Sequence, residues 1–190
     1  MKKIFFLAAC FYLTGCDLFT TRPAEPPDTP KSDFQPAFLP EILIDNFINS
    51  LKDKNIENYL SCISDSSDEV FTFSPSSEAL SQFPALGDNW SKNNESQYLN
   101  NLKIKIPDDK PLTLTLTNFS YNVQGENTRT FVASYTLSFT INDVTVPSYY
   151  EGELIFELIR NSKSTWSIYF WRDIKSSNSP SWSELKGRFY

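Results

Sequence analysis

The sequence offers few residues for catalysis. It contains no histidine and three cysteines, at positions 10, 16 and 62. Without histidine, the Ser-His-Asp and Cys-His arrangements, histidine-ligated metal sites and the usual general base near neutral pH are excluded. The cysteines form no Cys-x-x-Cys pair, and the five glycines form no phosphate-binding loop. The sequence therefore predicts no catalytic residue, no metal site and no cofactor.

Cys62 and an acidic loop carry weaker signals for chemistry. Cys62 lies on a predicted helix, and without a histidine to activate its thiol we expect a buried structural cysteine. Asp65, Asp68 and Glu69 could hold calcium loosely. Their spacing lacks the alternating pattern of a calcium-binding loop, so we expect a solvated loop instead.

The long strands predicted below carry apolar residues on their inner faces, with no carboxylate until Asp173, next to Arg172. We interpret a pairing of Arg172 with a nearby acid as structural rather than catalytic. Trp90, Trp166 and Trp171 are interpreted as core residues rather than as a ligand platform. The sequence leans towards a protein that is not an enzyme.

The N-terminus determines the expected location. Two lysines precede an apolar run from Ile4 to Leu13, which is too short to span a bilayer as a helix and fits a signal peptide. The run ends in Leu13-Thr14-Gly15-Cys16, which resembles the lipobox of bacterial lipoproteins. The resemblance implies a signal peptide over 1–15, cleavage between Gly15 and Cys16, and acyl chains on Cys16 that hold the protein at a membrane. The alternative is an ordinary secretory signal with a coincidental cysteine.

Residues 16–36 are predicted to form an extended tether, because prolines and polar residues dominate the segment. The chain has a formal net charge of −6, which repels nucleic acid and anionic lipid heads. The expected partners are the membrane, through acyl chains on Cys16, and a small apolar ligand or an envelope protein. We expect the protein in the bacterial cell envelope, facing the periplasm or the cell exterior.

One α+β domain is predicted over 37–190. Apolar residues recur at helical spacing over about 40–63, where Asn55 can cap a second short helix, and again over about 90–102. A short strand is expected at 70–73.

From 112 to 174 the apolar residues alternate with polar ones, which predicts four long antiparallel strands. The alternation changes parity near Thr117-Asn118, so a β-bulge is expected there. In the last strand the residues expected to face the core are Trp166, Ile168 and Phe170.

This order of elements resembles the nuclear-transport-factor-like superfamily, in which a curved, mainly antiparallel sheet wraps around helices as a cone. The resemblance covers about 40–174 and is mainly one of topology. It implies an α+β cone with four long strands and one short strand; a cystatin-like or lipocalin-like sheet is the alternative. The residues that carry it are Asn58-Tyr59, Phe71-Thr72-Phe73, the helix from Trp90 through Glu95 to Leu102, and Trp166 to Trp171.

The last two strands also carry apolar residues on their second face, namely Ile155, Ile159, Tyr169 and Trp171. Something should cover that face. Residues 180–190 carry an apolar helical stripe, and we expect this segment to pack across the outer side of the sheet. The alternative is a homodimer through the sheet, as the resemblance implies.

We therefore expect a membrane-anchored envelope lipoprotein whose domain is a non-catalytic binding or interaction module. One alternative is an isomerase or cyclase with its site in the cone, because enzymes of the resembled superfamily use an Asp base with a Tyr or a second carboxylic acid. Another is a structural assembly lipoprotein, which a closed cone would favour. Two titratable residues converging in a pocket would favour an enzyme.

Overall fold

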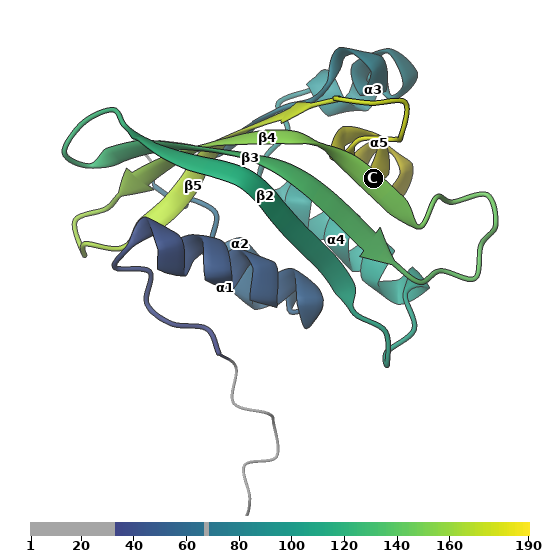
Figure 1. Ribbon diagram of the computed structural model, residues 1–190, viewed down its shortest axis with the longest axis horizontal. Helices are drawn as coiled ribbons and strands as arrows, with labels where there is room; N and C mark the ends of the chain where they lie inside the picture. The colour runs from purple at the N-terminus through teal and green to yellow at the C-terminus, as the bar shows by residue number, and fades with distance from the viewer. Residues whose placement is uncertain (1–32, 67–68) are drawn as a thin grey trace, which may run out of the picture. The chain divides into compact units, whose positions relative to one another are not determined.

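Five strands form one curved sheet with helices along its inner side (Figure 1). The computed structural model describes residues 33–66 and 69–190. The strand order is β1-β5-β4-β3-β2, and the predicted α+β fold class is confirmed. In chain order the elements are α1 (Pro40–Lys52), α2 (Ile56–Ser61), β1 (Thr72–Ser74), α3 (Ser77–Gln82), the 3₁₀ helix η2 (Pro84–Gly87), α4 (Lys92–Lys105), β2 (Leu112–Val123), β3 (Thr128–Phe139), β4 (Tyr149–Arg160), β5 (Trp166–Ile174) and α5 (Trp182–Phe189).

The first two helices form where the apolar spacing predicts them. Proline begins α1, where its missing N–H costs no hydrogen bond. The α1 residues Leu43, Phe47 and Leu51 are buried against the sheet. Asn55 caps α2 by accepting a hydrogen bond from the backbone N–H of Asn58 at 3.0 Å.

Antiparallel hairpins connect β2, β3, β4 and β5, and the short β1 pairs with β5 in parallel. The register between β2 and β3 shifts between Thr117 and Ser120, and Asn118 has a positive φ of 50°. The β-bulge predicted near Thr117-Asn118 is confirmed.

A second bulge, in β5, was not predicted. Glu157 pairs with Phe170 but Leu158 pairs with Ile168, which leaves Tyr169 as the extra residue. An extra residue reverses which side chains face inwards beyond it. Trp171 is therefore buried in the core and Phe170 faces outwards, so the predicted orientations of these two residues are wrong.

The C-terminal segment also differs from the expectation. It forms α5, which packs against the inner side of the sheet rather than across its outer side. The Trp182 ring lies 4.7 Å from that of Trp171, 5.4 Å from that of Tyr135 and 6.1 Å from that of Phe47, measured between centroids. The β5 bulge explains this placement, because it turns Trp171 inwards and gives the tail an apolar surface inside the cone.

The chain joins the domain before α1 begins. The backbone N–H and C=O of Gln35 both bond to the side chain of Asn46, and Ala37 accepts a hydrogen bond from the N–H of Trp166 at 2.8 Å. Among the described residues, no helix has the length and apolar character needed to cross a membrane.

Candidate functional site

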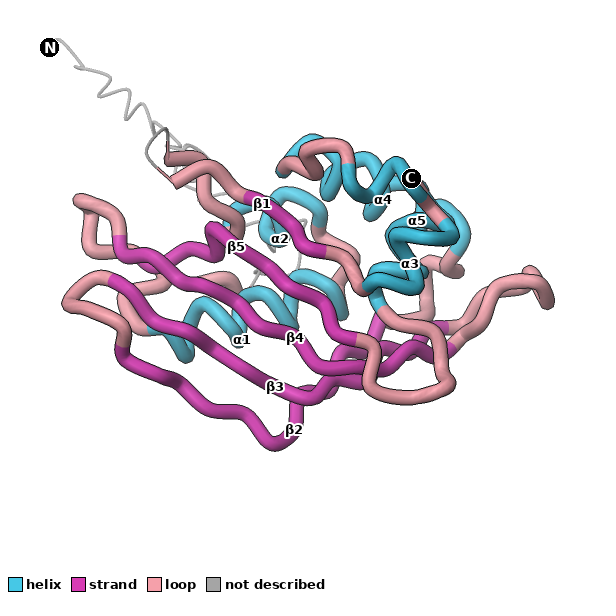
Figure 2. The backbone as a smooth tube through the Cα atoms, turned by 90° about the horizontal axis from the view of Figure 1, so that it is seen from above, coloured by secondary structure: helices cyan, strands magenta, loops and turns pink. Residues whose placement is uncertain are grey.

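Glu95 and Lys186 meet at the centre of the cone. Glu95 lies in the first turn of α4 and Lys186 in the last turn of α5, and the ammonium donates to the carboxylate Oε1. Both side chains have zero exposure to solvent. The two helices pack side by side at the end of the sheet away from the β2–β3 hairpin (Figure 2).

Further donors satisfy the Glu95 carboxylate. Trp90 Nε1 donates to Oε1 at 2.7 Å, and the Tyr59 hydroxyl donates to Oε2 at 2.8 Å. Burial and the nearby Glu95 charge raise the pKa of Tyr59 well above its usual value, so its hydroxyl remains a donor. Each oxygen of Glu95 thus has at least one donor.

Aromatic rings surround the Lys186 ammonium. Its Nζ lies 3.4 Å from the centroid of the Trp171 ring and 3.7 Å from that of Phe73. Such contacts stabilise a cation where water is excluded. Burial lowers the pKa of Lys186 to about 8, and the charges of Glu95 and Asp173 oppose that shift.

Asp173 forms a second buried network between β5 and α5. Its Oδ1 accepts from the Tyr135 hydroxyl at 2.7 Å, and its Oδ2 accepts from the N–H and the hydroxyl of Ser183 at 2.7 and 2.5 Å. The Tyr135 hydroxyl in turn accepts from the N–H of Trp182 at 2.7 Å. These bonds satisfy the first amides of α5, which a helix cannot satisfy internally.

These titratable groups converge in a closed interior, not in a pocket. The rings of Phe73, Trp90, Tyr98, Trp171 and Trp182 around the ion pair are all buried. Neither Glu95 nor Lys186 lines any of five surface pockets found among the described residues. A substrate would have to displace α5 to reach either residue.

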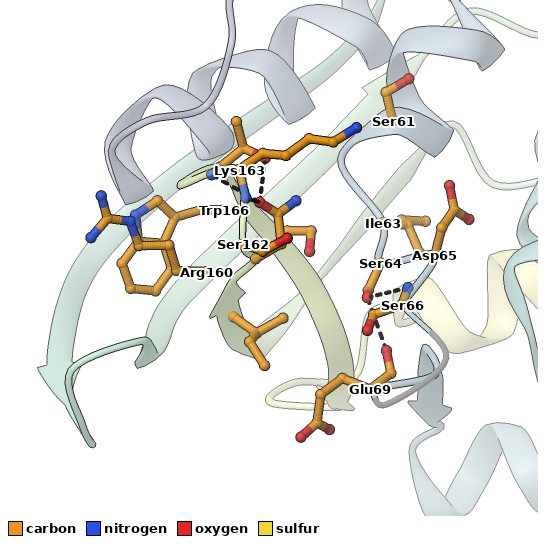
Figure 3. A pocket seen from close by; sticks show the side chains of 14 residues that line it. Ser61, Ile63, Ser64, Asp65, Ser66, Glu69, Arg160, Ser162, Lys163 and Trp166 are labelled. Carbon is orange, nitrogen blue, oxygen red and sulfur yellow. Dashed lines mark hydrogen bonds between the residues drawn. The ribbon is translucent and has the colours of Figure 1, made fainter.

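The largest of these pockets is an open surface groove of about 570 Å³ (Figure 3). It lies between the segment after α2 and the turn that joins β4 to β5. Acidic Asp65 and Glu69 stand on one side, and basic Arg160 and Lys163 on the other. Asn161 Oδ1 accepts hydrogen bonds from the backbone N–H groups of Lys163 and Thr165 and from the Thr165 hydroxyl, all within its own turn.

Several residues considered in the sequence have structural roles. Cys62 is buried, its thiol contacts the carbonyl of Asn58 at 3.4 Å, and burial raises its pKa to about 12. Arg172 is exposed and lies over the ring of Phe170. Trp90, Trp166 and Trp171 are buried core residues rather than a ligand platform, although Trp171 lies on the face of β5 opposite to the one predicted.

The remaining residues singled out in the sequence are the predicted lipidation site and the acidic loop. Gly15, Cys16 and Asp68 lie outside the described residues. Asp65 is exposed and pairs with Lys92, and the described residues contain no cluster of three or more potential metal ligands.

Sequence reasoning missed the Glu95–Lys186 pair. Glu95 was noted as part of a helix, and Lys186 lies one turn after Trp182 in the apolar stripe of the tail. The nearest available signal was this lysine on the apolar face of a short helix, which requires either a buried counter-ion or an exposed face.

No family model matches the chain, and no curated protein matches it either. Several solved structures match the chain in fold. A candidate aromatic ring hydroxylase from Novosphingobium aromaticivorans aligns with a TM-score of 0.56 at 14% identity, over 76% of this chain and 92% of the other. A candidate scytalone dehydratase from the same species gives 0.55 at 8% identity, over 74% and 88%. A nuclear transport factor 2 (NTF2-like) superfamily protein from Salmonella enterica gives 0.52 at 12% identity, over 72% and 89%.

The domain has the NTF2-like cone fold. At these identities the similarity concerns the fold and not the activity. The NTF2-like fold occurs in isomerases and dehydratases and in non-catalytic proteins. The interior of this particular cone must therefore be judged from its own residues.

Proposed function

We propose that this protein is a lipid-anchored envelope lipoprotein whose NTF2-like domain acts as a non-catalytic interaction module. The filled cone carries this proposal. In an enzyme on this fold the reacting groups need a cavity that admits substrate. Here Trp182, Leu185 and Lys186 of α5 occupy the interior, and all three are buried. None of these three side chains lines any of the five surface pockets described above.

The outer face of the sheet is the surface that supports interaction with a protein partner. Helices α1, α2 and α4 lie on the inner side in Figure 1. A row of side chains crosses the outer face, where the partly buried Val132 pairs with the partly buried Ile155, and Ile155 pairs with the exposed Arg172. A mixture of apolar and charged groups is typical of surfaces that bind proteins transiently.

The lipid anchor rests on the N-terminal sequence. Cys16 follows an apolar run of signal-peptide length, and acyl chains of this kind hold a soluble domain at a bilayer because each buried methylene contributes about 0.8 kcal/mol. Radioactive palmitate should label the wild-type protein in its host and fail to label the Cys16→Ser variant. Membrane retention of unlabelled Cys16→Ser protein would contradict the anchor.

Native mass spectrometry of the detergent-extracted protein tests the non-catalytic module. The expected mass is that of the acylated chain or of its complex with another polypeptide, without a small-molecule adduct. A small molecule retained by the wild type and lost from the Glu95→Gln variant would contradict the proposal, because it would place a ligand inside the cone.

A cavity enzyme of isomerase or dehydratase type is the second candidate. Two buried Tyr–carboxylate pairs, Tyr59 with Glu95 and Tyr135 with Asp173, supply donor and base groups of the kind such enzymes use. This function requires α5 to move as a lid.

The Gly187→Val variant tests a lid. A Cβ at Gly187 would lie only 2.7 Å from the Cβ of Phe83, so a larger side chain forces α5 away from that residue. If α5 is a lid, the variant stays folded and binds an apolar fluorescent dye. If α5 is part of the core, the variant loses thermal stability without a dye-binding folded state.

A further inference from the structure

Exposed apolar side chains gather at one end of the domain. Phe38, Leu39 and Val123 are 54%, 56% and 72% exposed. Together with Tyr121 they line a shallow groove of about 380 Å³. Phe119, also exposed, extends this surface, since its ring lies 6.4 Å from that of Tyr121. We name these five residues the tether-end patch.

The patch lies close to the point where the described chain begins. The start of α1, the tip of the β2–β3 hairpin and the turn between β4 and β5 surround its groove, at the left of Figure 1. Gln35 is bonded to Asn46, which is about 9 Å along α1 from Pro40. Asp33, where the described chain begins, precedes Phe38 by five residues and therefore lies within about 18 Å of the patch.

The length of the chain that leads back to Cys16 limits how far the domain, and the patch with it, can lie from the anchor. About 17 residues separate Cys16 from Asp33, and even when fully extended they span no more than about 60 Å. Tethering makes a second contact intramolecular, with an effective concentration on the order of millimolar for short linkers. A weak apolar contact is then sufficient to hold the domain against the membrane.

The charges around the patch are balanced. Arg129 and Arg160 line the groove together with Glu41 and Glu126. The Arg129 guanidinium bonds to the carbonyl of Gly125 and lies 5.2 Å from the Trp166 ring centroid. The surface therefore suits the apolar boundary of a bilayer without requiring anionic head groups.

We propose that the tether-end patch docks on the bilayer that holds the acyl chains of Cys16, with Phe38, Leu39 and Val123 at the boundary between head groups and acyl chains. This inference rests on the proposed acylation of Cys16. Docking would direct the β3–β4 loop, at the opposite end of the sheet, away from the membrane. Val144 in that loop is fully exposed, which makes it a matched control position.

The test uses the acylated full chain in vesicles of phosphatidylethanolamine and phosphatidylglycerol, with nitroxide-labelled lipid as quencher. A bimane label is attached in the Val123→Cys variant and, separately, in the Val144→Cys variant; Cys62 is buried and does not compete for the label. Quenching at position 123 several-fold stronger than at position 144 is expected. It should be equally strong in phosphatidylcholine vesicles, because the contact is apolar.

Two further readouts separate the outcomes. Adding Phe38→Ser and Leu39→Ser to the Val123→Cys variant should abolish the difference while the protein still floats with the vesicles; serine is tolerated at the α1 N-cap that Leu39 occupies. Floating protein with equal or no quenching at both positions overturns docking and leaves the anchor intact. Wild-type protein that does not float overturns the anchor, and docking with it.

Discussion

Two lysine–carboxylate pairs in this molecule have the same chemistry and opposite surroundings. Lys186 and Glu95 meet in the closed cone, where neither side chain reaches solvent. Lys92 and Asp65 meet at 2.6 Å beside the surface groove, where the Asp65 side chain is 79% exposed. Water screens the second pair and stabilises its separated charges, whereas each partner of the first pair depends on the other.

The comparison shows how a carboxylate inside an NTF2-like cone can be structural. The donors around Glu95 come from α2, the segment before α4, and α5, so the carboxylate ties together elements far apart in the sequence. A catalytic carboxylate would keep a free oxygen directed at a cavity. The following predictions test this difference, from the largest expected effect to the smallest.

The Lys186→Ala variant should lose about 3–5 kcal/mol of unfolding free energy, because it leaves Glu95 buried without its cation. Urea denaturation followed by circular dichroism measures the loss. The exposed Lys103→Ala variant, also in a last helical turn, is the control and should change by less than about 0.5 kcal/mol. Equal effects of the two substitutions would show that the pair is not buried in solution.

Combining Glu95→Gln with Lys186→Met should recover most of that loss, since buried ion pairs can be replaced by uncharged groups of similar volume. The double variant should lie within about 2 kcal/mol of the wild type. A double variant no more stable than Lys186→Ala alone would contradict a mainly electrostatic coupling.

The Asp173→Asn variant should lose about 1–3 kcal/mol, because an amide cannot accept all the hydrogen bonds that Tyr135 and Ser183 now donate. Thermal unfolding measures this effect. Asp143→Asn is the control, since Asp143 bonds only to its own loop at Thr145. An unchanged Asp173→Asn variant would argue against the role of this network in holding α5.

Stability in mildly alkaline solution should reveal the buried lysine. Unfolded lysine has a pKa near 10.4, whereas burial lowers the pKa of Lys186 to about 8. Between about pH 8 and pH 10.4 the unfolded state therefore binds more protons than the folded state, and this lysine makes the free energy of unfolding rise with pH. Cys62 acts in the opposite direction, because unfolded cysteine has a pKa near 8.5 and burial raises the pKa of Cys62 to about 12.

The wild type should therefore change little between about pH 8.5 and 9.5, and over the same pH unit the Cys62→Ala variant should gain up to about 1 kcal/mol, because one proton contributes at most about 1.4 kcal/mol per pH unit. Above about pH 10 both should lose stability, because burial raises the pKa of Tyr59, Tyr98 and Tyr135 and their unfolded forms ionise first. Urea midpoints across this range provide the measurement. A Cys62→Ala variant that loses stability from pH 8.5 onwards would contradict the placement of Lys186.

The Lys92→Ala variant should cost no more than about 1 kcal/mol, because Asp65 remains hydrated without its partner. The effect should shrink further in high salt. A loss as large as that of Lys186→Ala would contradict the contrast between the two pairs.

The fold could be predicted because it is encoded locally. Helical spacing over 40–63 and the alternation after 112 identify the elements, and the parity change at Thr117-Asn118 identifies the first bulge. The β5 bulge could not be predicted in this way, because apolar residues occupy both parities from Ile168 to Trp171. The one extra residue in β5, Tyr169, decides on which face of the sheet Trp171 lies, and Trp171 in turn decides where α5 packs.

The cone centre was beyond sequence reasoning for a different reason. Glu95 and Lys186 come from two helices that meet through the tertiary fold, and neither lies in a recognisable motif. Each has an ordinary explanation as an acid in a first helical turn and a base in a last one. Whether the two residues are helix-end charges at the surface or a buried ion pair depends on their burial, which the pattern of one helix does not reveal.

Amide hydrogen exchange of α5 tests the closed cone most directly. Because α5 is held by Asp173, Tyr135 and the Glu95–Lys186 pair, the amides of Leu185 to Phe189 should exchange as slowly as those at the centre of β3 and β4, through global unfolding alone. Fast exchange of α5 while β3 and β4 stay protected would show that the helix opens on its own, and would contradict the account.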